Sequence, residues 1–405
     1  MKTRTRKVVG IVAALAFVAG ACGSDDDEGS DTTEAPADDE AAAGGDEAAD
    51  DDAAAGGEGS IWVLLPDSAT SDRWETADRR FFSEAFDAAG LSEGDDYSIV
   101  NAEGDAATQI SQAEQAIGDG ASVILLTSND SGSGATIIDL ATEAGVEVVE
   151  YDRFNTEGSS GGAAYVSFDN VAVGATMASV LEPAIDALGV SPAQVVMQNG
   201  GEEDNNAFLF RDGYAATVEP RVEAGDWELV ADQFTPGWDN AEALSIAEQI
   251  LVGAENNVNG WFAANDGIAN SVIAAIESAG LDPSTIPVSG QDATTAGLQN
   301  ILLGKQAMTV YKPIAAEAAV GAQIALALRA GEDVTSQTGD FEIIGIDADG
   351  KPTADASGGV PYIALVPIAV TADNILETVI ADGFDTVENI CTGEVAETQF
   401  CLDNA

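Results

Sequence analysis

The sequence predicts an α/β protein made of two doubly wound lobes. Short runs rich in Val, Ile and Leu, without polar alternation, recur between longer stretches of helical periodicity, as in parallel sheets covered on both faces. The pattern occurs in two consecutive series, one from Ile61 and one from about Ser167. A chain of 405 residues is long enough for two domains. We therefore expect one parallel sheet in each lobe.

The first series predicts strands and helices in strict alternation. Its expected strands are 61–65, 97–101, 122–127 and 146–151, and its expected helices are 72–88, 108–117 and 134–143. The second series predicts helices 171–188, 207–218, 241–252 and 268–279 and strands 194–198, 228–234, 260–264 and 286–289. A strand at 308–310 then precedes a long helix, 315–330, and two strand-like runs, 341–346 and 362–366.

A turn is expected between those last two runs, at Asp347-Ala348-Asp349-Gly350. The segment faintly resembles a calcium-binding loop, but the third Asp and the distal Glu of such a loop are missing. A solvated hairpin is therefore favoured over a metal site.

Four polar motifs stand where apolar strands end, and they outline a binding site. They are Tyr151-Asp152-Arg153, Ala264-Asn265-Asp266, Gly290-Gln291-Asp292 and Tyr311-Lys312-Pro313. In open α/β sheets, ligands bind outside the carboxyl ends of the strands. Four such ends that carry Arg, Lys, Asp and Asn predict one convergent polar pocket.

Composition argues against catalysis and against nucleic-acid binding. The chain has no His, which removes the commonest general base and the Ser-His-Asp triad. Asp and Glu number 71 against 14 Lys and Arg, so the chain repels phosphate backbones. We expect no enzyme activity, no cofactor, no metal and no nucleic-acid partner.

Two short patterns that could indicate an enzyme are weak. The run Gly158-Ser159-Ser160-Gly161-Gly162 matches a nucleophile elbow, but no His is present to activate a serine. No Gly-x-Gly-x-x-Gly follows the first strand, where Ser68-Ala69-Thr70-Ser71 stands instead, so a dinucleotide site is disfavoured.

The amino terminus predicts export. Residues 1–21 combine a basic start with an apolar run too short to span a bilayer, as in a signal peptide. Ala19-Gly20-Ala21-Cys22 resembles a bacterial lipobox, in which Cys22 would carry the lipid; ordinary cleavage after Ala21 is the alternative. Residues 22–59 then predict an acidic, disordered tether, because the segment lacks aromatic and basic residues.

The two remaining cysteines, Cys391 and Cys401, lie close together near the carboxyl terminus. Export would place them in an oxidising compartment, which favours a disulfide over two free thiols.

With these motifs in order, the chain resembles the periplasmic pentose- and hexose-binding proteins (periplasmic binding protein type 1), and most closely the D-xylose-binding proteins of sugar ABC transporters. The resemblance covers about Ile61 to Phe384 and also rests on Ser167-Phe168-Asp169-Asn170, Asp204-Asn205-Asn206-Ala207 and Met308-Thr309-Val310. It implies two Rossmann-like lobes joined by three crossovers. The implied lobes are 60–168 plus 312–365, and 169–311 plus 366–405.

The resemblance also implies a set of sugar contacts. Matched motif by motif, these are Arg73, Trp74, Asp152, Arg153, Asn206, Trp238, Asn265, Asp292 and Lys312. Trp74 and Trp238 would cover the two sugar faces, and Arg73 would bond hydroxyls. The family often has a Lys near the segment 62–67; this chain has none, and we expect Asp67 to face solvent.

Each of these residues also has a purely structural interpretation. Asp152-Arg153 could be a surface pair, and both tryptophans could be core residues. Asp266 is expected to cap the helix at Ile268, and Asp292 could cap the next one. The family pattern favours the binding interpretation.

The sequence thus predicts a monomeric, lipid-anchored, extracytoplasmic receptor that delivers a monosaccharide to an ABC permease by hinge closure. An exported glycosidase that uses two carboxylates is the first alternative. A sensor on the same fold, which hands the sugar-bound form to a signalling protein, is the second. The sequence does not distinguish xylose from its near relatives.

Overall fold

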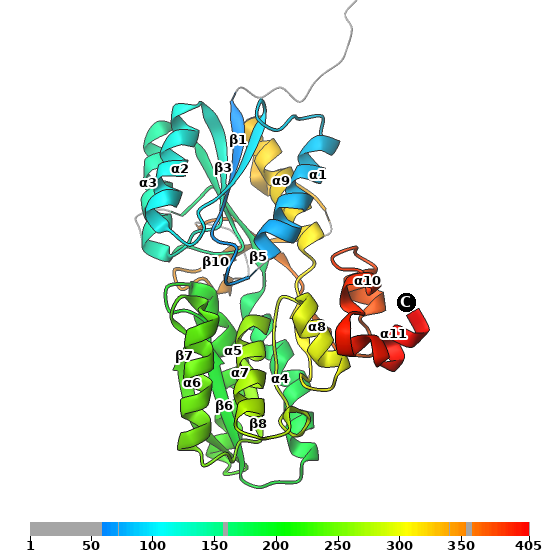
Figure 1. The fold of residues 1–405 in the computed structure, drawn as a ribbon. Coiled ribbons are helices and arrows are strands. Elements are labelled where there is room, and N and C mark those ends of the chain that lie inside the picture. The colour runs from blue at the N-terminus through cyan, green and yellow to red at the C-terminus, as the bar shows by residue number, and fades with distance from the viewer. Residues whose placement is uncertain (1–58, 72, 157–160, 340, 354–358, 405) are drawn as a thin grey trace, which may run out of the picture. The chain divides into compact units, whose positions relative to one another are not determined.

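The computed structural model describes residues 59–71, 73–156, 161–339, 341–353 and 359–404 (Figure 1). The predicted signal peptide, the lipidation site Cys22 and the tether up to residue 58 lie outside the described residues. They stay predictions.

An eight-stranded sheet contains all four strands predicted from the first series. Its order is β11-β10-β12-β5-β4-β3-β1-β2. The strands are β1 (Ser60–Leu65), β2 (Tyr97–Asn101), β3 (Ala121–Leu126), β4 (Glu147–Tyr151), β5 (Ala164–Phe168), β10 (Glu342–Ile346), β11 (Pro352–Thr353) and β12 (Tyr362–Leu365). Strands β1 to β5 and β12 pair in parallel, while β10 is antiparallel to both β11 and β12.

Strand β1 is buried on both faces, which explains its unbroken apolar sequence. Ile61, Val63 and Leu65 belong to the core cluster that includes α1 and α9. Trp62 and Leu64 point the other way, into the cluster with α2 and α3. Figure 1 shows α2 (Ala106–Gly118) and α3 (Ser131–Ala144) on one side of the sheet and α1 (Arg79–Ala88) and α9 (Ile314–Arg329) on the other.

A second, three-stranded parallel sheet has the order β7-β6-β8, with β6 (Ala193–Asn199), β7 (Trp227–Phe234) and β8 (Gly260–Ala263). The predicted strand 286–289 is wrong: Val288 makes only an isolated bridge to Trp261. Pro287 has no backbone N–H to donate, so the ladder cannot extend there. A short antiparallel pair, β9 (Thr309–Tyr311) with β13 (Ile368–Val370), is linked to this region by a bridge between Gln291 and Val310.

The helices of the second series are α4 (Asn170–Ala187), α5 (Asn205–Glu223), α6 (Asn240–Gly253) and α7 (Asp266–Ser278). The sequence patterns missed helix α8 (Thr295–Leu302) and strand β5. The predicted helix 72–88 is present, but Trp74–Asp78 forms a π-helical segment (η1) ahead of α1. Such segments occur frequently at functional sites.

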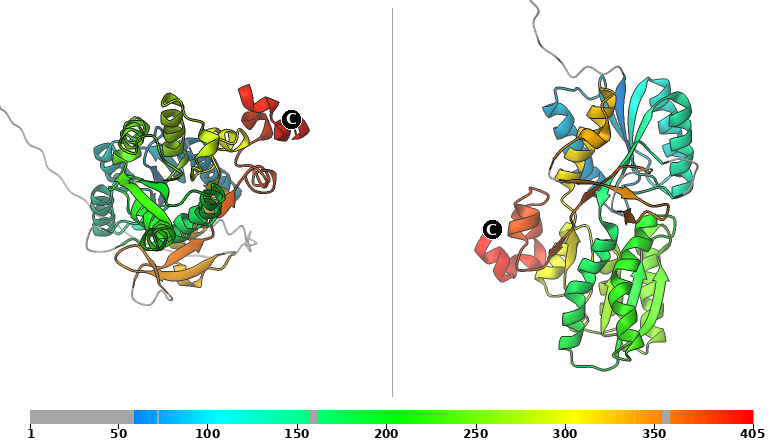
Figure 2. Two further views of the ribbon diagram at one scale, coloured as in Figure 1. Left: turned by 90° about the horizontal axis from the view of Figure 1, so that it is seen from below. Right: turned by 180° about the vertical axis from the view of Figure 1, so that it is seen from behind.

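The carboxyl-terminal segment packs against α8. It contains the short helices α10 (Val387–Ile390) and α11 (Gln399–Asn404), and Cys391 and Cys401 form a disulfide with Cα atoms 5.5 Å apart. Gln299 of α8 donates to the carbonyl of Ile390 at 2.9 Å. Both views of Figure 2 show this red segment beside the yellow helix α8.

The turn expected at Asp347–Gly350 joins β10 to β11. The Asp347 carboxylate accepts the backbone N–H groups of Asp349 and Lys351, at 3.0 and 2.9 Å. The segment is a hairpin turn, as predicted.

Candidate ligand-binding site

All nine residues singled out by the sequence line one cavity. With them stand Thr70, Ser71, Asp204, Phe210 and Gln291, around a narrow cavity of about 30 Å³. The lining follows β1, β4, β6, β7, β8 and β9, so it lies at the carboxyl ends of the strands. A wider groove between β7 and α6, about 770 Å³ by the same measure, has only Glu228 and Glu255 as charged lining residues. The smaller cavity is therefore the better candidate.

Asp152 is the centre of the charged network in this cavity. Its Oδ2 accepts from Lys312 Nζ at 2.7 Å and from Arg73 Nη1 at 3.0 Å. Asn206 Nδ2 donates to the backbone carbonyl of Asp152 at 3.0 Å. Burial alone would raise the pKa of this carboxyl, but the charges of Lys312 and Arg73 outweigh burial and lower the pKa below its ordinary value. Asp152 is therefore an ionised acceptor.

Most N–H groups of Arg73 donate to carboxylates of the chain and are not available to a ligand. Its Nε and Nη2 donate to the two oxygens of Asp78, at 3.0 and 3.1 Å, and Nη2 also faces Glu317 at 3.4 Å. A guanidinium has five N–H groups, and Asp152 takes a fourth. One N–H of Nη1 remains, so Arg73 has a single N–H with which to bond a hydroxyl.

Asp78 and Glu317 were not predicted from the sequence. Both are fully buried, on η1 and α9, and nothing in their local sequence separates them from other acids. Burial raises the pKa of Glu317 well above its ordinary value, and the Asp152 charge adds to the effect. The raised pKa favours the protonated form of Glu317, which would lower the cost of crowding several carboxylates around one guanidinium.

Arg153 connects two parts of the cavity wall. Its Nε lies 3.0 Å from Asp204 Oδ2, and its Nη1 donates to the carbonyl of Ser128 at 2.9 Å. Asp204 also caps α5 by accepting the backbone N–H of Asn206 at 2.9 Å. Because Asp204 is this cap, the start of α5 positions both Asn206 and the Asp204 carboxylate that pairs with Arg153.

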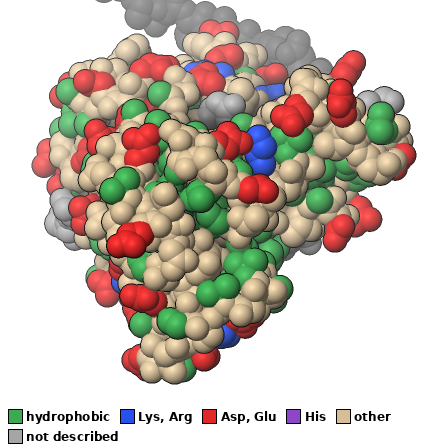
Figure 3. Space-filling model, turned by 60° about the horizontal axis from the view of Figure 1, so that its bottom comes forward, with side chains coloured by type: hydrophobic (Ala, Val, Ile, Leu, Met, Phe, Trp, Pro, Cys, Tyr) green, Lys and Arg blue, Asp and Glu red, His purple; other side chains and the backbone are tan. Residues whose placement is uncertain are grey.

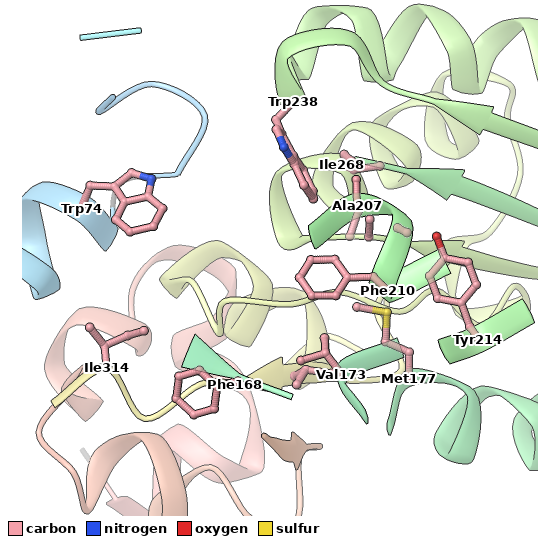
Figure 4. Close-up of a cluster of buried hydrophobic side chains, with 14 of the residues drawn as sticks. Trp74, Phe168, Val173, Met177, Ala207, Phe210, Tyr214, Trp238, Ile268 and Ile314 are labelled. Atoms are coloured by element: carbon pink, nitrogen blue, oxygen red, sulfur yellow. The ribbon is translucent and has the colours of Figure 1, made fainter. Parts of the chain in front are cut away.

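The two tryptophans supply the flat apolar surfaces of the cavity. Trp74 and Trp238 are 3% and 7% exposed, and Figure 4 shows Trp74 on one side with Trp238 and Phe210 on the other. Neither indole Nε1 has a hydrogen-bond partner in the described part of the chain. A buried N–H without an acceptor is costly, so each indole N–H needs an acceptor that the described chain does not provide. Phe210 was not predicted from the sequence. Its ring lies edge-on to the Trp238 ring, with the two ring centroids 6.4 Å apart.

The structure decides which residues cap the helices. Asn265, and not Asp266, caps α7 by accepting the N–H of Ile268 at 2.8 Å. Asp266 instead accepts from Gln306 and from the backbone of Thr294, each at 2.8 Å. The cap of α8 is Thr294.

Asp292 is therefore not needed as a helix cap. Its Oδ1 accepts from Gln291 Nε2 at 2.7 Å, and its Oδ2 lies 3.5 Å from Ser71 Oγ. Asp292 thus keeps acceptor capacity that faces the cavity.

Asp67 does not face solvent, contrary to expectation. It is 7% exposed and accepts the backbone N–H groups of Ala69 and Thr70, each at 2.8 Å. The carboxylate thus shapes the loop that brings Thr70 and Ser71 to the cavity.

Three lining residues have a left-handed backbone. The φ angles are 62° at Asp152, 54° at Trp238 and 93° at Asp292. Such conformations cost about 1–3 kcal/mol each and concentrate at functional sites. Their presence in one cavity supports a binding role.

The described residues contain neither a metal-binding cluster nor a membrane-spanning helix. No cluster of three or more His, Cys, Asp or Glu residues there is arranged to hold a metal ion. Among the described helices, none combines the length and apolar character needed to cross a membrane.

Comparison with known proteins identifies the family. The model of the periplasmic binding protein domain matches residues 62–333. The D-xylose-binding periplasmic protein of Haemophilus influenzae is 33% identical over 331 residues, which cover 81% of this chain and 91% of the relative. The protein of the same name from Escherichia coli is 32% identical and covers 78% and 88%.

Solved structures agree with the predicted fold class. A carbohydrate transporter solute-binding protein from Chloroflexus aurantiacus, in complex with D-glucose, superposes with a TM-score of 0.68 at 25% identity, covering 81% of this chain and 97% of that one. The two-lobed periplasmic binding protein type 1 fold is confirmed. The chain belongs to the periplasmic binding protein family, as its motifs predicted.

Proposed function

We propose that this protein is an extracytoplasmic receptor that binds a neutral monosaccharide, D-xylose or a similar pentose or hexose, and delivers it to an ABC permease. The observation that carries the proposal is the cavity itself, in which two tryptophans and a dense set of charged and amide groups surround one space. The D-xylose-binding relatives named above support the same ligand class.

The chemistry of the lining suits a pyranose. Flat indoles match the C–H faces of the sugar ring, and polar groups match its rim of hydroxyls. A hydroxyl buried without a partner costs about 1–3 kcal/mol, so a rim of hydroxyls requires such a dense polar lining. Asp152 and Asp292 accept, Lys312 and Asn265 donate, and the indole N–H groups add two donors.

The charges of the lining favour an uncharged ligand. Three cations line the cavity, Arg73, Arg153 and Lys312, and three carboxylates oppose them, Asp152, Asp204 and Asp292. A sugar phosphate or a sugar acid would add an unbalanced buried charge. The acidic surface agrees: Figure 3 shows many Asp and Glu and few Lys and Arg on the face in view.

The lobe boundaries are part of the proposal. We assign 60–168 plus 312–365 to one lobe and 169–311 plus 366–405 to the other. The assignment is supported by sheet membership, since β1 to β5 and β10 to β12 share one sheet and β6 to β8 another. Hinge motion at the three crossovers would close the cavity over the sugar.

Family membership implies an extracytoplasmic location. Attachment through a lipid at Cys22 and a monomeric state remain proposals. Of the alternatives, a glycosidase needs two carboxyl groups that act on the sugar as acid and base, whereas Asp152 and Asp204 in this cavity are paired with Lys312 and Arg153.

A thermal-shift screen of residues 60–405 against monosaccharides tests the proposal. A ligand at 100 times its dissociation constant stabilises by about 2.7 kcal/mol, so xylose or a near relative should raise the melting temperature clearly. Aldonates and sugar phosphates should not. The Trp238→Ala and Asp292→Ala variants should lose the shift. A wild-type protein that no sugar stabilises, or variants that respond like wild type, would contradict the proposal.

A further inference from the structure

Gly200, at the end of β6, lies directly beneath the indole of Trp238. A Cβ built on Gly200 would come within 2.5 Å of Trp238 Cζ3 and closer still to Cζ2 and Cη2. Carbon atoms in ordinary contact are about 3.5–4 Å apart, so a methyl group here would displace the ring by roughly 1 Å or more. Gly200 does not line the cavity, so any effect on a ligand must pass through Trp238.

The backbone around this contact is fixed, which leaves the indole as the part that must move. Thr235 N–H donates to the carbonyls of both Asn199 and Gly200, at 3.1 and 3.0 Å. Trp238 N–H donates to Thr235 O at 3.1 Å, and the turn passes through φ angles of 63° at Gly237 and 54° at Trp238. The end of β6 and the turn that carries Trp238 are thus hydrogen-bonded together.

We propose that Gly200 is a positioning residue for ligand binding. Because Gly200 has no side chain, the Trp238 ring packs directly against its backbone, and this contact sets the depth and tilt of the indole in the cavity. The inference rests on the proposed sugar-binding function. The proposal adds a residue outside the cavity to those that determine affinity. The distance between the Trp238 ring and the opposite wall of the cavity depends on how closely the ring can approach the Gly200 backbone. A binding site tolerates errors of only about 0.5 Å in such supports.

Gly201 offers a matched control one residue away. The three atoms nearest to a Cβ at Gly201 would all belong to the carboxylate end of Glu203, a long and partly exposed side chain. Neither Gly200 nor Gly201 has a positive φ, so alanine is not strained by the backbone at either position.

The test measures sugar affinity by calorimetry for wild type, Gly200→Ala and Gly201→Ala, with the sugar that best stabilises the wild type. We expect Gly200→Ala to weaken binding by about tenfold or more and Gly201→Ala by less than about threefold, where tenfold corresponds to about 1.4 kcal/mol. Equal affinities for the two alanine variants would overturn the proposal. A wild type that binds no sugar would instead refute the proposed function.

A second variant separates positioning from general damage. Trp238→Phe removes the benzo ring that contacts Gly200, so Gly200→Ala in the Trp238→Phe background should weaken binding by less than about a further threefold, the coupling expected of residues in contact. If Gly200→Ala alone fails to fold, Trp238→Phe should restore folding. A full additional loss in the Trp238→Phe background, or no restoration, would show that the methyl group acts elsewhere and would overturn the proposal.

Discussion

Replacing Lys312 with glutamine should destabilise the fold even without sugar. Lys312 Nζ lies 2.7 Å from Asp152 Oδ2, and the two side chains are 2% and 4% exposed. Removal of one partner from a buried ion pair typically costs about 3–5 kcal/mol, because the other charge stays buried. Asp152 keeps Arg73, so we expect the lower end, about 3 kcal/mol.

The chain contains a matched control for this substitution. Lys351 Nζ lies 2.5 Å from Asp212 Oδ2, but these side chains are 46% and 41% exposed. Exposed ion pairs contribute about 0–1 kcal/mol, so Lys351→Gln should change stability by less than about 1 kcal/mol. The comparison therefore holds the chemistry constant and varies burial.

The assay is urea unfolding of both variants at pH 7 and at lower pH, without ligand. The folded pKa of Asp152 is lowered, so its stabilisation is fully present above its unfolded pKa of about 4 and is lost as the pH falls toward the folded value. The deficit of Lys312→Gln should therefore be largest above about pH 4 and shrink below it. If Lys312→Gln costs no more than Lys351→Gln at pH 7, the buried network does not stabilise the fold as argued.

Three further predictions concern other sites. Asp292→Asn should weaken sugar binding about tenfold or more in calorimetry, because charge-assisted hydrogen bonds become neutral ones. The fold should be retained, since Asn tolerates the φ of 93° at this position. Unchanged affinity would show that Asp292 does not bind the sugar. Burial raises the pKa of Asp266 to about 7, so this carboxyl should lower the stability by up to about 4 kcal/mol as the pH rises from about 4 to about 7, and its contribution to the fall should level off above pH 7. Melting temperatures at pH 5 and pH 8 check this, and Asp266→Asn should lose most of that fall; a variant with the wild-type pH profile would count against it. Replacing both Cys391 and Cys401, which lie ten residues apart, with alanine should cost about 3 kcal/mol within the carboxyl-terminal segment and leave sugar affinity unchanged, as hydrogen exchange and calorimetry would show; unaltered exchange there would contradict the prediction.

The strands were predictable where burial on both faces leaves only apolar side chains. Strand β1 is the clearest case, since residues 61–65 are buried on alternate faces and therefore form one continuous apolar run. Strand β5 was missed because Ser167 interrupts its short apolar run and two glycines, Gly161 and Gly162, precede it. The prediction of a strand at 286–289 was wrong because hydrophobic periodicity takes no account of the backbone N–H that Pro287 lacks.

The candidate site was predictable because its residues follow strands in fixed local motifs. Asp152, Asn265, Asp292 and Lys312 were named from the ends of four apolar runs, and the structure brings them to one cavity. Phe210 could not be named in this way, because its ring reaches Trp238 from the interior of α5.

The sequence by itself determined the fold class, the family and the polar groups at the strand ends, because periodicity and short motifs are local properties. Only the tertiary structure decided how those groups share their hydrogen bonds. It assigned four of the five N–H groups of Arg73 to Asp78, Asp152 and Glu317, and placed the indole of Trp238 against Gly200. The hydrogen bonds of a donor and the position of a ring depend on the atoms within a few ångströms. In this cavity those atoms come from distant parts of the chain.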